Sequence, residues 1–256
     1  MTTDRQLFDY LLRLADSDLI LAQRLGEWIG HGPVLEEDIA LANVGLDLLG
    51  QARMWFAYAG EVEARFRGVG RTEDELAFSR DGPDFRNLLL VEQPNGNYAD
   101  TMARQLYFDV WHELALTELS RSTDTRIAEI AVKSLKEAIY HAERSTDWVI
   151  RLGDGTPTSH DRMQAAIDTL WPYTGEMFSG DETDAALAGD KLVCDPTSLK
   201  HAWLERIAVV LSEATLTLPS NDWMQRGGKQ GVHSEHLGHM LAEMQWLQRA
   251  YPGAQW

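Results

Sequence analysis

The feature that most constrains this chain is a series of long segments in which apolar residues recur every three or four positions. The first segment runs from about Asp4 to Ile29. Its stripe consists of Leu7, Leu11, Leu14, Leu21, Leu25 and Trp28. Such spacing puts the side chains on one face of an α-helix and does not fit a strand, whose period is two. Gly32-Pro33 follows and ends the helix.

Three more long helices are predicted by the same periodicity. They span about Glu36 to Phe66, Tyr98 to Ser120, and residues 125–152. On the second helix, the predicted buried stripe is Ile39, Ala42, Leu46, Leu49 and Phe56. Asn95-Gly96-Asn97 has the chemistry of a turn that caps the third helix. Because only residues 122–124 separate the third and fourth helices, we expect these two to be antiparallel neighbours.

The rest of the chain is also predicted to be helical, but it is less regular. Expected helices are Asp161 to Phe178 with an interruption at Pro172, Ser198 to Leu216, and Ser234 to Ala250. Residues 67–84 read as a charged connection, and 85–94 as a short apolar run of undetermined type. We predict an all-α chain with one domain over residues 1–256. A core bundle occupies about 4–153, and a C-terminal helical extension occupies about 154–256.

Composition excludes several classes of function. A formal net charge of −17 disfavours binding to nucleic acid or to anionic membranes. No segment approaches the roughly 20 apolar residues of a membrane span, and the acid-containing N-terminus does not resemble a signal peptide. Cys194 is the only cysteine, so no internal disulfide forms. These features predict a cytoplasmic protein.

Four long helices are the layout of a ferritin-like carboxylate bundle, and this raises the question of a metal site. Such bundles hold two metal ions with a Glu from each of two helices and a Glu-x-x-His from each of the other two. The chain contains no Glu-x-x-His. The second helix has no His, and Asp47 is followed three residues later by Gly50. On the fourth helix, Tyr140 lies three residues after Glu137, and His141 comes one later, rotated by about 100°.

Two interpretations of the polar residues remain open. One is an altered metal site built from Asp18, Asp47, Asp109, Glu137 and either His112 or His141. The other, which the missing imidazole favours, is a vestigial set of polar groups that pair with one another, with Tyr140, Arg53 or Arg104, or with buried water. We therefore expect no metal and no catalytic residue in this chain.

Two further clusters are candidate binding sites. His233, His236 and His239 drift around the last helix, so a shared metal ion is disfavoured, and we expect partly exposed polar residues at the helix start. Before them, Arg226, Gly227, Gly228 and Lys229 form a loop that could hold an anion or contact a partner. This loop lacks the spacing of a phosphate-binding loop.

Three segments carry a resemblance to a known family. LANVGLDLLGQAR from Leu41, NLLLVEQPNGNYADTMARQ from Asn87 and GGKQGVHSEHLGHMLAEMQWLQ from Gly227 resemble the C-subunit family of the bacterial ring-1,2-phenylacetyl-CoA epoxidases. The resemblance covers nearly the whole chain. It implies a ferritin-like, non-catalytic structural subunit of a multicomponent monooxygenase in aerobic phenylacetate degradation.

The resemblance also implies partners and cofactors outside this chain. A catalytic A subunit holds the di-iron centre, a B subunit links A–C units, and a reductase with FAD and an iron–sulfur cluster delivers electrons from NADPH to act on phenylacetyl-CoA. In isolation, the chain is a candidate homodimer. Two alternatives are a stand-alone di-metal oxidase and an acyl-CoA-binding module that uses the Arg226–Gly231 loop.

Overall fold

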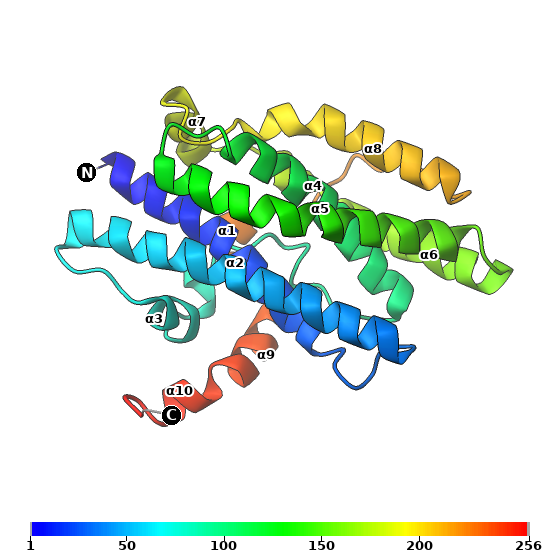
Figure 1. The fold of residues 1–256 in the computed structure, drawn as a ribbon, viewed down its shortest axis with the longest axis horizontal. Coiled ribbons are helices and arrows are strands. Elements are labelled where there is room, and N and C mark those ends of the chain that lie inside the picture. Colours follow the sequence, from blue (N-terminus) through cyan, green and yellow to red (C-terminus); the bar gives the residue numbers. More distant parts are fainter. Residues whose placement is uncertain (1, 255–256) are drawn as a thin grey trace. The chain divides into compact units, whose positions relative to one another are not determined.

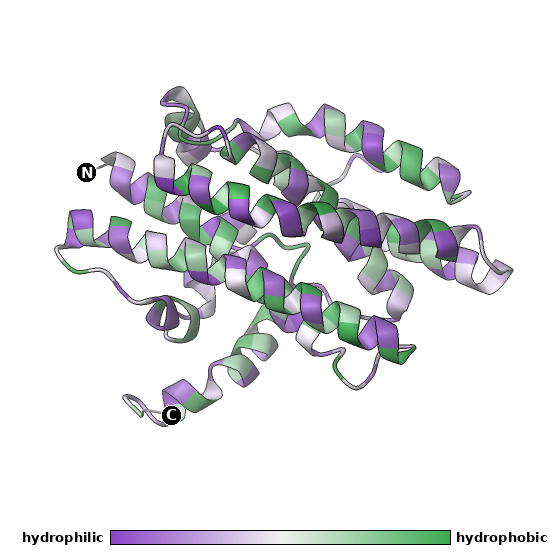
Figure 2. Ribbon diagram, viewed as in Figure 1, coloured by the Kyte–Doolittle hydropathy of each residue, from purple (hydrophilic) through white to green (hydrophobic). Residues whose placement is uncertain are grey.

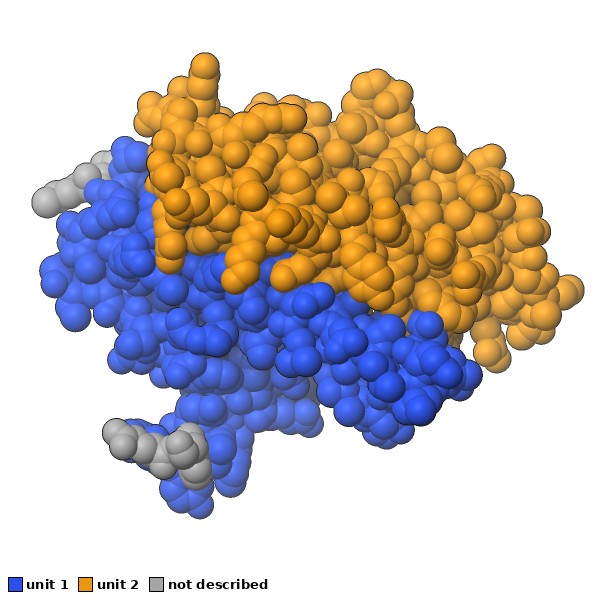
Figure 3. Space-filling model, viewed as in Figure 1, with its two compact units in different colours: residues 1–94, 227–256 blue, residues 95–226 orange. Residues whose placement is uncertain are grey.

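The computed structural model describes residues 2–254, and these form helices and connecting loops with no strand among them (Figure 1). The all-α prediction is confirmed. The chain divides into two compact units, residues 1–94 with 227–256, and residues 95–226, which Figure 3 colours separately. Compact units need not be independent domains, so the prediction of one domain stays a prediction.

The first unit is built on a pair of long helices, α1 (Thr2–Gly26) and α2 (Leu35–Arg67), which pack along their lengths. A short helix α3 (Glu73–Phe78) and the 3₁₀ turn η1 (Gly82–Asp84) follow. The C-terminal part of the chain completes the unit with η5 (Gly228–Gln230), α9 (Glu235–Met244) and α10 (Trp246–Ala250).

The second unit is built on α4 (Tyr98–Leu119) and α5 (Thr125–Gly153), which form the expected antiparallel pair. Asn97 caps α4 in a capping box with Asp100, as the turn chemistry predicted. The helix α6 (Pro157–Leu170) packs on both, and α8 (Lys200–Glu213) does so as well. The short elements between them are η2 (Trp171–Tyr173), η3 (Gly175–Phe178), α7 (Glu182–Gly189) and η4 (Pro196–Leu199).

Several predicted boundaries were wrong, each for a local reason. The first helix ends at Gly26 and not at Ile29, because the chain turns through Gly30 at φ +82°, and the Asp38 carboxylate accepts the N–H groups of Gly30 and Gly32 at 2.8 and 2.9 Å. The expected helix 234–250 is two helices, α9 and α10, which meet at Gln245. Its buried side chain donates to the carbonyls of Ala77 and Arg80 at 3.0 and 3.1 Å.

The predicted buried stripe of α2 was also largely wrong. Ile39, Leu46 and Leu49 are exposed, and only Phe56 of the four large residues is buried. The face that packs in the unit carries Leu41, Val44, Leu48, Ala52, Trp55, Ala59 and Val62. Both rows recur at three- and four-residue steps, so periodicity alone cannot choose between them. The helix is therefore apolar on two sides.

Candidate functional site

Four of the predicted site residues lie on the α4–α5 pair. Asp109 and His112 are one turn apart on α4, and His141 lies on α5; all three side chains are buried. Gln105 Nε2 donates to Asp109 Oδ1 at 3.4 Å. Glu137, also on α5, is only partly buried. One unit thus contains a buried carboxyl and two buried imidazoles.

Burial favours the uncharged forms of Asp109 and His112. It raises the pKa of Asp109 from its usual 3.8 to about 7, although a hydrogen bond with Ser145 and the charges of Arg144 and Arg104 act in the opposite direction. Burial, with a smaller effect from His141, lowers the pKa of His112 from 6.5 to about 3. His112 is consequently a neutral imidazole at physiological pH.

The donor set of a di-metal carboxylate site is not assembled. Across residues 2–254, no three His, Cys, Asp or Glu side chains form a group able to hold a metal ion. The helix α2 supplies no imidazole, and the Glu137–His141 spacing of four differs from the required three. The residues present do not fit a di-iron centre.

The remaining candidates lie on α1 and α2. Asp18 is buried, whereas Asp47 is only partly buried. Of the cations proposed as partners of the polar set, Arg53 is exposed and bonds Glu73 at 2.7 Å. Arg104 donates to Asn95 Oδ1 at 2.7 Å, and its charge also lowers the pKa of Asp109. Tyr140 is half exposed. The vestigial character of the set stays a prediction.

The loop at 226–229 is less open than the sequence suggested. Arg226 is exposed, but Gly228 and Lys229 are buried. Gly227 has a φ of +135°, and a Cβ there would lie 2.9 Å from the carbonyl oxygen of Val232. Glycine at 227 is therefore required by the backbone turn itself. Since Lys229 is buried, an anion site that needs both cations at the surface is disfavoured.

One buried ion pair of the described residues was not predicted from the sequence. It joins Asp16 on α1 to Arg80, which follows α3; both are almost fully buried. Asp16 Oδ2 accepts from Arg80 Nη1 at 3.0 Å and from the Arg86 backbone N–H at 2.8 Å. The Arg80 guanidinium also lies 4.3 Å from the centre of the Phe85 ring. This cluster ties the segment 80–86 to α1.

A second buried cluster ties the C-terminal helices to the same region. Glu92 is fully buried and accepts from Asn87 Nδ2 at 3.0 Å, from the Ser234 N–H at 2.7 Å and from His233 Nδ1 at 2.9 Å. His233 Nε2 lies 3.0 Å from the Phe85 carbonyl oxygen. Both ring nitrogens face acceptors, an arrangement that favours the protonated imidazolium form of His233. His233 as a residue is partly exposed, as expected, but its imidazole side chain is only 6% exposed.

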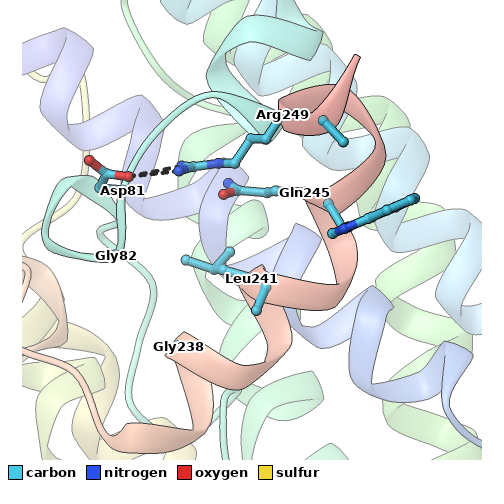
Figure 4. A pocket seen from close by; sticks show the side chains of 9 residues that line it. Asp81, Gly82, Gly238, Leu241, Gln245 and Arg249 are labelled. Atoms are coloured by element: carbon cyan, nitrogen blue, oxygen red, sulfur yellow. Dashed lines mark hydrogen bonds and ion pairs between the residues drawn. The ribbon is translucent and has the colours of Figure 1, made fainter. Parts of the chain in front are cut away.

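A cavity of about 510 Å³ lies beside α9 and α10 (Figure 4). Arg249 crosses to Asp81, with its two Nη atoms at 3.0 and 2.9 Å from Oδ1, and Leu241 and Gln245 also line the space. Arg249 and Asp81 neutralise each other's charge. Among the described lining residues, no nucleophile or acid–base pair faces the cavity. Its contacts attach the last two helices to residues 77–82.

A family model described as phenylacetic acid catabolic protein matches residues 1–256. The chain belongs to this family. A relative with a matching description is the C subunit of 1,2-phenylacetyl-CoA epoxidase from Escherichia coli (strain K12), which is 53% identical over 251 residues, or 98% of this chain and 99% of that protein. The resemblance seen in three segments therefore extends over almost the whole length of the chain.

The structure adds one finding about membranes. None of the helices described for this member of the family is both long enough and apolar enough to cross a bilayer.

The His233–Glu92 pair predicts a pH-dependent stability. Burial lowers the pKa of His233, but the hydrogen bonds to Glu92 and Phe85 outweigh it, and the net effect raises the pKa. A raised pKa stabilises the fold fully below the unfolded value of about 6.5, and this contribution disappears as pH rises through the folded value. We expect His233→Gln to cost on the order of 1.5–3 kcal/mol at pH 6 and clearly less at pH 9.

Urea unfolding of wild type and His233→Gln at the two pH values measures this difference. His236→Gln, which changes the neighbouring histidine on α9, is the matched control. A cost that is the same at pH 6 and pH 9 would mean that His233 is not held as an imidazolium.

Proposed function

We propose that this chain is a structural, non-catalytic subunit of a 1,2-phenylacetyl-CoA epoxidase in aerobic phenylacetate catabolism. The observation that carries the proposal is the 53% identity with the C subunit of that enzyme over nearly the full length of both chains. The α4–α5 groups support it, because burial shifts the pKa values of both Asp109 and His112 toward their uncharged forms, as a bundle needs when no metal ion balances them.

The chemistry of the reaction then belongs to partners. A catalytic A subunit holds the di-iron centre, a B subunit links A–C units, and a reductase with FAD and an iron–sulfur cluster supplies electrons from NADPH. In this proposal the present chain binds no cofactor, works in the cytoplasm, and acts by holding the A subunit in its working conformation. The isolated chain, without these partners, is a candidate homodimer.

One experiment tests the proposal. The chain is captured by an affinity tag from its native host, and the subunits are separated and analysed for iron and manganese. We expect an A-type ferritin-like partner that carries the iron, no stoichiometric metal in this chain, and no epoxidation of phenylacetyl-CoA by this chain alone. Stoichiometric metal together with activity in the separated chain would instead establish a stand-alone oxidase.

A substitution at a former ligand position provides a second test. Glu137→Gln removes the charge of the candidate carboxylate on α5 while keeping its shape. Because the proposal assigns this residue no chemistry, turnover of the reconstituted complex is expected to stay within about twofold of wild type. The measurement is NADPH-dependent consumption of phenylacetyl-CoA. A large loss of turnover in a folded variant would show a chemical role for Glu137.

A further inference from the structure

One face of α2 carries a row of apolar side chains that are largely exposed. The row, here called the α2 seam, consists of Leu35, Ile39, Ala42, Leu46 and Leu49. The exposed fractions are 71% for Leu35, 51% for Ile39, 66% for Leu46 and 38% for Leu49. Single exposed apolar residues are normal on a protein surface, but a contiguous row marks an interaction site. Figure 2 shows the apolar positions that recur along α2.

The spacing of the seam specifies what kind of element covers it. The steps between successive residues are four, three, four and three. This is the heptad pattern in which one helix packs its side chains into another. From Leu35 to Leu49 the seam extends over about 21 Å at 1.5 Å per residue. The expected occupant is therefore a helix of about four turns, lying along α2.

A groove beside the seam supplies an anchoring point. A cavity of about 240 Å³ lies between α1 and α2, and Leu46 and Leu49 of the seam form part of its wall. Leu19, Ile29 and Ala42 also line it, and Gln23 is the only polar side chain among its described lining residues. A dry cavity of about 150 Å³ is large enough for benzene. This groove can therefore accept an aromatic or leucine side chain, as the central pockets of interfaces do.

Charge decides between a second copy of this chain and a different partner. No Lys or Arg occurs from Gly26 to Ala52, whereas Glu36 and Asp38 flank the seam on its two sides, about 100° and 60° around the helix from Leu35. A second copy of the chain would bring only acidic residues to the flanks of the seam, with no cation in this stretch to pair with them. Each chain also carries −17 in total, so two copies repel each other. The seam therefore fits a partner whose apolar helix is flanked by basic residues.

We propose that the α2 seam is the docking surface for the catalytic A-type subunit, which lays an apolar, base-flanked helix along α2 and inserts a large apolar side chain into the adjacent groove. This inference rests on the proposed function, since it takes the partner from there. The sequence predicted that Ile39, Leu46 and Leu49 belong to the core of this chain. In this proposal they instead form an interface with another subunit.

The test compares two substitutions of matched exposure. Leu46→Glu puts a charge on the seam, and Val209→Glu makes a similar change on α8, where the side chain is 65% exposed. Binding of the separately purified A-type subunit of the same host to the full chain is measured by calorimetry. We expect Leu46→Glu to weaken binding at least tenfold and Val209→Glu to leave it within about twofold. Circular dichroism checks that both variants fold, and Ile39→Glu replaces Leu46→Glu if the latter does not.

A charge-reversal variant tests the identity of the partner. Glu36→Lys is expected to weaken binding, and the difference from wild type should shrink as salt is raised, because salt screens exposed charges. Stronger binding by Glu36→Lys would contradict a base-flanked partner.

The outcomes separate the two proposals. If the wild-type chain does not bind the A-type subunit at all, the proposed function fails. If it binds and the folded seam variants bind equally well, the function stands and the seam is not the docking surface. Self-association of the wild-type chain in sedimentation, abolished by Leu46→Glu, would make the seam a homodimer face and overturn the inference.

Discussion

Replacing Arg80 with alanine is expected to lower the free energy of unfolding by about 3–5 kcal/mol. The side chain is almost completely buried, and its guanidinium is paired with Asp16, which is itself fully buried. Arg80→Ala leaves that carboxylate in the interior without its counter-charge, and the remaining donor, the Arg86 backbone N–H at 2.8 Å, cannot balance a full negative charge. The loss of the stacking on Phe85 adds to the effect.

The control for this prediction is Arg53→Ala. Arg53 also bonds a carboxylate, Glu73, at 2.7 Å, but its side chain is largely exposed. Water solvates both charges when such a pair is broken, so the unfolding free energy should stay close to wild type. Urea titrations followed by circular dichroism measure both variants. Similar losses for Arg80→Ala and Arg53→Ala would contradict the assignment of Asp16–Arg80 as the buried anchor of the segment 80–86.

Replacing Asp109 with asparagine is expected to stabilise the protein relative to wild type as pH rises. The folded pKa of about 7 lies above the usual 3.8, so between these values the folded state keeps a proton that the unfolded state has lost. Stability from this group therefore falls with increasing pH, and the fall is complete above the folded value. At about 1.4 kcal/mol per pKa unit, the difference between Asp109→Asn and wild type should move by about 2–3 kcal/mol in favour of the variant from pH 5 to pH 8.

The comparison requires unfolding curves of both proteins at the two pH values. Asp147→Asn makes the same change at an exposed position of α5 and is the matched control. If the difference between Asp109→Asn and wild type does not change with pH, Asp109 is not held as a neutral carboxyl. A change in the opposite direction would indicate a cation close enough to keep it ionised.

Much of the fold could be predicted from the sequence because its signals are local. The cap at Asn97, the break before Pro172 and the short connection between α4 and α5 each depend on a few neighbouring residues. The helix α3 was missed although Thr72 and Glu75 form a capping box there, since six residues are too few to show a period. The break at Gln245 was missed because its cause is a pair of carbonyls some 165 residues earlier in the chain.

The sequence showed which residue types the candidate site contains, but it did not show the partners that surround them in the fold. The missing imidazole of the second helix is visible in the sequence, and so is the misplaced His141. The role of Asp16, two residues before the proposed Asp18, is not visible in the sequence. Asp16 pairs with Arg80, which lies 64 positions later in the chain. His233 was treated as a surface residue for the same reason, since Glu92 lies 141 positions away.

The sequence by itself determined that the chain is helical, where its long helices lie, and that it lacks the ligand pattern of a di-iron bundle, because periodicity, caps and ligand spacing are read within one helix. Only the tertiary structure decided which of the two apolar rows of α2 is buried. Both rows satisfy the helical period equally, and the choice depends on packing within the first unit, which leaves Leu35, Ile39, Leu46 and Leu49 at the surface.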